Sequence, residues 1–226
     1  PSSDPAEYRT RARRPSQSSP SRGCRPRRSR AFVAALLPSP GIAAGAAANR
    51  PLGIPALQEF IPAGGTWTIG AQPQIVVRPR DRTTLRREAA QLARDLSAVL
   101  GRAVRISAGR RGRRGDIVLA RSGRSARLGA EGYRLRINRA FTILASTGTG
   151  VFYGGRSLLQ LVQSGQPIPP RRAQDWPRYP QRGLMLDLGR RPYPLAWLEA
   201  YVSDMGYLKL NLLHLHLTDD QRWGIV

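Results

Sequence analysis

Two short apolar runs near the end of the chain are each followed by polar or aromatic side chains that could do chemistry. An arginine can hold sugar hydroxyls or pair with a carboxylate, because its planar guanidinium presents several donors at once. A neighbouring carboxylate can accept a hydrogen bond from a guanidinium, and a tryptophan can offer an apolar ring face to a sugar. This combination indicates half of a carbohydrate pocket. The candidate residues are Asp187, Arg190, Asp219, Asp220 and Trp223.

The elements expected to position these side chains form one strand–helix–strand unit. Residues 184–188 are a short apolar run that holds one acid, Asp187, and apolar runs are typical of parallel strands buried on both faces. Pro194 suits the first turn of a helix, and residues 211–217 form the second expected strand. In a (β/α)8 barrel the C-terminal ends of the strands form the active-site face, and the candidates fall at these ends. The helix is expected to bury a stripe of apolar residues, namely Leu195, Leu198, Val202, Met205 and Leu208.

The two histidines of the sequence, His214 and His216, alternate with leucines in the second expected strand. We expect them to be packed strand residues rather than metal ligands, because the chain has no further histidine. The sequence therefore predicts no metal site and no cofactor. Two simpler interpretations stay open: Asp187 forms hydrogen bonds only within the barrel, and Arg190 is an ordinary surface residue.

Residues 51–172 predict an α+β domain with helices on one face of a sheet. Apolar residues three or four apart predict helices over residues 84–100 and 150–162. The Gly-Thr-Gly sequence at residues 148–150 is expected to be a turn and a helix start, because no phosphate-loop Gly-Lys-Ser/Thr follows. Residues 173–181, rich in Pro and Arg, predict a linker. Short extended or alternating runs predict strands at residues 66–69, 75–77, 103–107, 116–120, 133–137 and 141–144.

Residues 1–48 predict a disordered leader followed by a secretory signal peptide. The leader is rich in Arg, Ser and Pro and is too polar to fold. A basic run at residues 25–30, an apolar run at residues 31–37 and a small-residue stretch follow in the order of a signal peptide. The alternative is an Ala-rich linker. We expect a secreted or extracytoplasmic protein without a membrane anchor, because the apolar run is too short for a span.

The formal net charge of +23 allows two interpretations. A strongly basic chain can bind nucleic acid or another anionic surface. However, Lys209 is the sole lysine among the 37 basic residues, and selection for phosphate binding would use lysine as well. Compositional bias is therefore favoured, and no nucleic-acid partner is expected. Cys24 is the one cysteine, which excludes an internal disulfide.

The strand motifs of residues 182–226 resemble those of glycoside hydrolase family 20. Residues 182–191, Arg-Gly-Leu-Met-Leu-Asp-Leu-Gly-Arg-Arg, are similar to that family's first barrel strand. Residues 208–221, with Lys-x-Asn, His-x-His and Asp-Asp-Gln, are similar to its second strand. Upstream, Glu-Gly-Tyr at residues 131–133 and Phe-Tyr-Gly at residues 152–154 resemble its non-catalytic N-terminal domain. The resemblance implies an α/β and α+β chain, with an N-terminal α+β sandwich followed by the first βαβ unit of a truncated TIM (β/α)8 barrel.

The resemblance also implies a retaining, substrate-assisted β-N-acetylhexosaminidase that acts on N-acetylhexosamine-containing glycans. Arg190 would bind hydroxyls of the terminal sugar, and Asp219 would polarise an active-site histidine beyond the chain. The family's Asp-Glu pair, which orients the acetamido group and transfers the proton, would lie beyond Val226, so we expect the chain alone to be inactive. The remaining candidates would line the pocket or have structural roles, namely Asp187, Asp220 and Trp223.

Two departures from the family pattern leave the substrate open. Gly189 stands where serine is common and Arg191 where histidine is, a variant shared by lacto-N-biosidase-like members. Residues 221–224 exchange the usual Gly and Arg around the tryptophan. Two hypotheses from other classes also stay open, a basic nucleic-acid-binding module and a standalone glycan-binding domain at residues 51–172. The sequence does not predict the oligomeric state.

Overall fold

The computed structural model describes residues 53–62, 65–165, 168, 171–220 and 222–223. The predicted leader and signal peptide, residues 1–48, lie outside the described residues. Within the described part of the chain, no helix combines the length and the apolar character that crossing a membrane requires.

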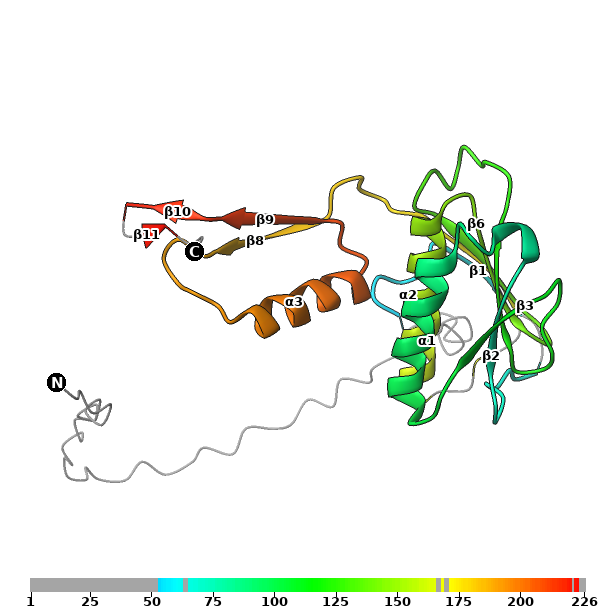
Figure 1. Cartoon of the computed structure of the whole chain (residues 1–226). Helices are drawn as coiled ribbons and strands as arrows, with labels where there is room; N and C mark the ends of the chain where they lie inside the picture. The colour runs from blue at the N-terminus through cyan, green and yellow to red at the C-terminus, as the bar shows by residue number, and fades with distance from the viewer. Residues whose placement is uncertain (1–52, 63–64, 166–167, 169–170, 221, 224–226) are drawn as a thin grey trace, which may run out of the picture. The chain divides into compact units, whose positions relative to one another are not determined.

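Seven strands form a mixed sheet in the first part of the described chain (Figure 1). Their order across the sheet is β1-β7-β5-β6-β4-β2-β3. β2, β3, β4 and β6 run parallel to one another, whereas β5 pairs antiparallel with β6 and β7, and β1 pairs antiparallel with β7. The strands are β1 (Glu59–Pro62), β2 (Gln74–Val77), β3 (Arg105–Ala108), β4 (Ile117–Arg121), β5 (Tyr133–Ile137), β6 (Phe141–Ala145) and β7 (Arg171–Asp175).

Two helices, α1 (Arg86–Leu100) and α2 (Gly148–Gln163), lie on one face of this sheet (Figure 1). The predicted α+β architecture is therefore confirmed. The predicted helix start is confirmed as well, because the side chain of Thr147 caps α2 by accepting a hydrogen bond from the backbone N–H of Gly150 at 3.1 Å. A short 3-10 helix, η1 (Pro79–Asp81), precedes α1. The core between helices and sheet includes the fully buried side chains of Leu85, Leu96, Tyr133, Phe141, Ile143 and Leu158.

Helix α2 packs directly against the sheet at Gly154. A Cβ atom at this position would meet Cγ2 of Ile143 at 2.4 Å and Cδ2 of Tyr133 at 3.2 Å. Only glycine permits so close an approach of the helix backbone. The neighbouring Gly155 faces Leu92 of α1, where a Cβ atom would make ordinary contacts of 3.4 Å and longer. Gly154 therefore helps to set the distance from α2 to β5 and β6, together with Gly150, where a Cβ atom would lie 2.7 Å from Cβ of Ala145.

A second, smaller sheet follows, and it is the predicted strand–helix–strand unit. β8 (Gly183–Asp187) pairs in parallel with β9 (Leu212–His216), and α3 (Leu195–Tyr207) runs alongside them (Figure 1). A short hairpin of β10 (Thr218–Asp219) and β11 (Arg222–Trp223) comes next. A parallel strand pair joined by a helix is the unit from which (β/α) barrels are built, which confirms the expected fold class.

The predicted buried stripe of α3 is only partly formed. Met205 is buried and Leu198 is half-buried, whereas Leu195 is 72% exposed, Val202 52% and Leu208 37%. Within the described residues, α3 lies beside the two strands of the small sheet and meets α2 near its C-terminal end, at Gly206 and Tyr207. The expectation of a continuous buried stripe is therefore wrong for this structure, because there is little surface for the stripe to pack against.

Two expected boundaries also differ from the structure. Residues 66–69 form no strand and make one isolated bridge, from Trp67 to Ile168. β7 includes the first three residues of the predicted linker, residues 173–181, and pairs with β1 on one side and β5 on the other. Ala173, in the middle of β7, is buried against the core. The Arg-rich and Pro-rich composition of this segment obscured its strand character.

Candidate functional site

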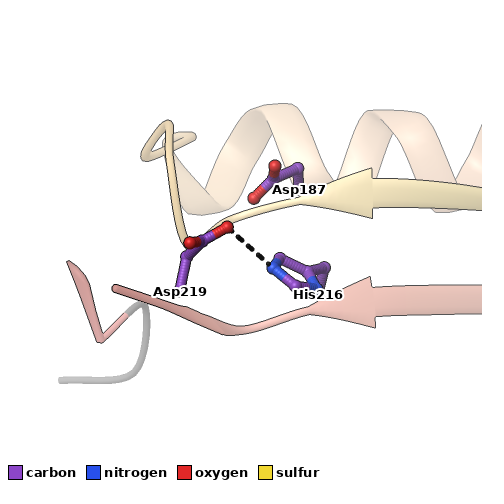
Figure 2. A group of neighbouring side chains, drawn as sticks. All are labelled: Asp187, His216 and Asp219. Carbon is purple, nitrogen blue, oxygen red and sulfur yellow. Dashed lines mark hydrogen bonds and ion pairs between the residues drawn. The ribbon is translucent and has the colours of Figure 1, made fainter. Parts of the chain in front are cut away.

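The C-terminal ends of β8 and β9 bring polar side chains together. The parallel register places Asp187 opposite His216, at the last position of each strand. Just beyond, the backbone N–H groups of Leu188 and Gly189 both donate to the carbonyl of His216, at 2.8 and 3.0 Å. Figure 2 shows the carboxylate of Asp219 turned toward the ring of His216. The strand ends therefore bring Asp187, His216 and Asp219 together.

Gly189 allows the two strand ends to approach closely. It is buried, and a Cβ atom there would lie 3.1 Å from both the backbone nitrogen of Asp219 and the carbonyl carbon of Thr218. These distances are tighter than ordinary contacts, so a side chain would push this segment away slightly. This glycine therefore lets Asp219 lie close to the end of β8.

Arg190 lies between two carboxylates. Its Nε is 2.5 Å from Oδ2 of Asp187 and 3.4 Å from Oδ2 of Asp219, and its backbone N–H donates to Oδ1 of Asp187 at 3.0 Å. This backbone bond, together with the side-chain bond and charge of Arg190, lowers the pKa of Asp187 below its ordinary value. The bond and the charge of Asp187 raise the pKa of Arg190. Asp187 is therefore ionised at neutral pH and holds a charged guanidinium.

Asp219 connects the arginine to the histidine. Its Oδ2 lies 3.3 Å from Nε2 of His216, and its Oδ1 accepts a hydrogen bond from the backbone N–H of Asp220 at 2.8 Å. Hydrogen bonds with the side chain and the backbone of Asp220, and then the one with His216, lower the pKa of Asp219. Two ionised carboxylates thus face one guanidinium and one imidazole.

The guanidinium of Arg190 is accessible to a ligand. Its side chain is 59% exposed, and among the described residues its contacts with acids are made by Nε. The donors of the two terminal nitrogens suit a partner with paired acceptors, such as adjacent sugar hydroxyls or a carboxylate. Because two carboxylates already hold the arginine in place, a ligand does not have to order it.

A metal ion is the competing interpretation of this cluster. Ligand atoms of Asp187, His216 and Asp219 all lie within 4.8 Å of one another. However, the guanidinium of Arg190 contacts both carboxylates and supplies their positive charge. A cation at the same place would be repelled by that guanidinium or would have to displace it. The residues present therefore fit the binding of hydroxyls better than the ligation of a metal.

The other predicted residues have different outcomes. Asp220 is exposed and contributes its backbone N–H to Asp219. Trp223 belongs to β11 through its backbone, and its side chain lies outside the described residues. The expectation that both histidines are packed is wrong, because His214 is exposed and the side chain of His216 is 40% exposed and faces Asp219. A two-stranded sheet leaves this side of β9 open within the described part of the chain.

Sequence reasoning missed a second polar cluster, at the N-terminal ends of β8 and β9. Lys209 is buried there, and its Nζ lies 2.9 Å from Oδ2 of Asp175 and 2.8 Å from the hydroxyl of Tyr133. Nearby, Nη2 of Arg182 lies 2.6 Å from Oε2 of Glu131. The available signal was the solitary lysine, because a single lysine in an arginine-rich chain indicates a position that requires an amine rather than a guanidinium.

Two family models match the chain. The model described as "Glycosyl hydrolase family 20, domain 2" matches residues 53–176, and the model described as "Glycosyl hydrolase family 20, catalytic domain" matches residues 179–226. The boundary between the two matches falls between β7 and β8, where the large sheet ends and the small sheet begins.

Similar proteins include β-hexosaminidases and a lacto-N-biosidase. The β-hexosaminidase of Akkermansia muciniphila is 46% identical over 103 residues, which cover 43% of this chain and 21% of that protein. The lacto-N-biosidase of Bifidobacterium bifidum is 28% identical over 171 residues, 75% of this chain and 15% of that protein. A solved structure of a mutant β-hexosaminidase of Streptomyces plicatus, in complex with the product GlcNAc, aligns with a TM-score of 0.63 and 30% identity, over 75% of this chain and 35% of that one. The chain thus spans only a minor part of each of these proteins.

Proposed function

Because the chain belongs to glycosyl hydrolase family 20, we propose that it supplies part of the sugar pocket of a β-N-acetylhexosaminidase, which hydrolyses terminal N-acetylhexosamine residues from glycans. The observation that supports this most is Arg190, which is exposed at the ends of two parallel strands and held by two ionised carboxylates. A guanidinium fixed in this way is suited to adjacent sugar hydroxyls.

The neighbours of Arg190 have supporting roles in this proposal. The carboxylate of Asp187 fixes the arginine, because it contacts both the backbone N–H and the side chain of Arg190. Asp219 fixes the arginine and an imidazole at the same time, and His216 is the imidazole that it contacts among the described residues. The sugar would therefore meet a polar surface whose donors are already oriented.

We propose that the groups that break the glycosidic bond lie outside the described residues of this chain. In substrate-assisted retaining hydrolysis, the substrate's acetamido group attacks the anomeric carbon while a protein carboxylic acid protonates the leaving oxygen. The two aspartates that hold Arg190, Asp187 and Asp219, both have lowered pKa values, and an ionised carboxylate cannot donate that proton. By the family resemblance, a separate Asp-Glu pair performs this step. We therefore expect the 226-residue chain to bind the sugar weakly and not to hydrolyse it.

Ligand-observed NMR on the 226-residue chain tests the sugar-binding role. We expect N-acetylglucosamine to bind with a dissociation constant of about 1 mM or weaker, and Arg190→Ala to abolish the signal. Arg110→Ala is the matched control, because it removes the same charge from an exposed loop of the large-sheet domain. Sugar binding that survives Arg190→Ala unchanged would contradict the role. Turnover of a chromogenic N-acetylglucosaminide by the purified chain would contradict the expected inactivity.

A lacto-N-biosidase-like activity is the second candidate. It is favoured by the match to the Bifidobacterium protein, which extends over 75% of this chain, and by Gly189 and Arg191 in the first strand motif. Such an enzyme must accept a disaccharide, so its pocket needs room for a second sugar. We propose to compare lacto-N-biose with N-acetylglucosamine in the same NMR titration. Tighter binding of the disaccharide favours the second candidate, and equal or weaker binding favours the first.

Export from the cytoplasm is also proposed, from the sequence of residues 1–48 alone. A basic run, an apolar run and small residues in this order support cleavage by a signal peptidase. Expression in a secreting bacterial host, followed by mass spectrometry of the N-terminus, tests it. Cleavage within residues 41–48 is the expected result, and an uncleaved cytoplasmic product would refute the proposal.

A further inference from the structure

The N-terminal ends of β8 and β9 carry polar residues that the sugar chemistry does not use. Three residues of the small sheet's segment contact three residues of the α+β domain, and together they are named the junction cluster. We propose that the junction cluster is the docking surface through which the α+β domain holds the first two barrel strands in register. Its members are Arg182, Lys209 and Asn211 on one side and Glu131, Tyr133 and Asp175 on the other.

Lys209 is the centre of the junction cluster. It has a φ of 60°, in the backbone region that favours glycine, and its amine contacts Asp175 at 2.9 Å and the Tyr133 hydroxyl at 2.8 Å. Tyr133 in turn donates to Asp175 at 2.6 Å and lies 2.6 Å from the hydroxyl of Ser157 on α2. Burial lowers the pKa of Lys209, and the charge of Asp175 acts in the opposite direction. A buried charge of this kind requires its partner, so each side of the junction needs the other.

Glu131 binds both strand starts at once. Its Oε2 accepts from Nη2 of Arg182 at 2.6 Å, and its Oε1 accepts from Nδ2 of Asn211 at 3.0 Å. Arg182 and Asn211 also bond to each other. The backbone N–H of Arg182 donates to Oδ1 of Asn211 at 2.9 Å, and the backbone N–H of Asn211 donates to the carbonyl of Arg182 at 2.8 Å. One carboxylate of the α+β domain therefore holds Arg182 beside Asn211 and so fixes the register in which the two strands start.

The small sheet needs such support, because an isolated pair of strands is marginally stable in water. Met185 on β8 and Leu215 on β9 remain 59% and 39% exposed, so the pair buries little apolar surface within the described residues. Helix α2 of the α+β domain adds further contacts: the side-chain amide of Gln160 donates to the carbonyl of Tyr207 at 2.9 Å, and the hydroxyl of Tyr153 lies 3.5 Å from the carbonyl of Leu210. Polar contacts to that domain thus supply order that burial does not.

Register at the strand starts determines geometry at the strand ends. Pairing runs without interruption from Gly183 opposite Leu212 to Asp187 opposite His216. A slip of one residue at the start would move Asp187 away from His216 and turn its side chain to the other face of the sheet. The docking surface therefore also places the carboxylate that holds Arg190, whichever ligand that site takes.

A cavity of about 460 Å³ lies at the junction, and it is better explained as part of the docking surface than as a ligand site. Its lining includes Arg182, Lys209, Glu131 and Asp175. These four charged side chains are paired with one another, Arg182 with Glu131 and Lys209 with Asp175. A ligand that used any of them would have to break an existing pair.

Hydrogen exchange on the 226-residue chain tests the docking surface. Lys209→Met removes the buried amine with little change in side-chain length, and Arg110→Met removes the same charge from an exposed loop as the matched control. We expect the amides of β8 and β9 to exchange at least about tenfold faster in Lys209→Met, which corresponds to about 1.4 kcal/mol. The amides of β4 and β6, inside the large sheet, should keep their wild-type rates in both variants.

Glu131→Gln is the milder second variant, because this carboxylate is partly exposed and Gln keeps its shape. It should also accelerate exchange in β8 and β9 and shift the Nε resonance of Arg190, which a merely local loss of stability near Glu131 would not do. Equal acceleration in both sheets in both variants, or acceleration in neither, overturns the proposal. No sugar enters this experiment, so its failure is distinct from a failed sugar titration.

Discussion

A pair of adjacent glycines in α2 allows the packing of this helix on the sheet to be measured. Gly154 and Gly155 both lie inside the helix and are buried, so replacement of either by alanine gives the same gain in helix propensity, about 1 kcal/mol. The added methyl group meets different surroundings. At Gly154 it would lie 2.4 Å from Cγ2 of Ile143, whereas at Gly155 it would make ordinary contacts with Leu92.

The difference between the two variants isolates the effect of the close approach. Overpacking of a rigid core costs about 1–3 kcal/mol, and the 2.4 Å contact places Gly154→Ala within this range. Gly154→Ala is therefore expected to be neutral to about 2 kcal/mol less stable than the wild type, while Gly155→Ala should be up to about 1 kcal/mol more stable. Their melting temperatures should differ by about 2–4 °C for each kcal/mol of that difference.

Urea denaturation followed by circular dichroism at the helix band is the appropriate assay, with thermal melting as a second measurement. The free energy of unfolding should be higher for Gly155→Ala than for Gly154→Ala. The wild-type value should lie between the two or be close to that of Gly154→Ala. Equal shifts in both variants, or greater stability of Gly154→Ala, would show that the helix does not rest on the sheet at that residue. Gln160 and Tyr153 of the same helix contact the small sheet's segment, so a displaced α2 should also accelerate exchange in β8 and β9.

Three further predictions concern the cap, the core and the site. Thr147→Ala removes the hydrogen-bonding cap of α2 and should lower the free energy of unfolding by about 1 kcal/mol in the same urea titration; no change would contradict the capping role. Leu158→Ala, at a fully buried position, should cost about 2–5 kcal/mol, and a loss below about 1 kcal/mol would indicate that the core is not packed as described. The Asp187 carboxyl should titrate by carbon NMR below its ordinary pKa of about 3.9, and Arg190→Ala should raise that midpoint. Because this pKa is lowered in the folded chain, the stability contributed by Asp187 is present above about pH 3.9 and is lost as the pH falls through the lowered value. A titration midpoint of Asp187 at or above about 3.9 would refute its pairing with Arg190.

The sequence predicts those elements whose pattern is local. The apolar spacing of α1 and the alternation of β5 are visible within a few residues, and both elements form where expected. The polar residues after β8 and β9 are equally local, which is why the amino-acid pattern alone assigns Asp187, Arg190 and Asp219 to one edge of the sheet. β7 was not recognised, because its composition is that of a linker and only pairing with β1 and β5 makes it a strand.

The junction cluster could not be predicted, because its contacts join residues far apart in the chain. Lys209 meets Asp175 across 34 positions and Tyr133 across 76. No periodicity or short motif encodes such a pairing. The exposure of the apolar stripe on α3 was likewise beyond local reasoning, because spacing identifies an apolar face but not whether the chain contains a surface to cover it.

The solitary Lys209 makes the contact between the two sheets chemically addressable. Its amine is the only lysine side-chain amine that the sequence offers to an acylating reagent. In the docked arrangement this amine is buried and held by Asp175, so modification has to wait for the strands to separate. The rate at which a single acyl group appears on an otherwise lysine-free chain would therefore measure how often the two parts come apart.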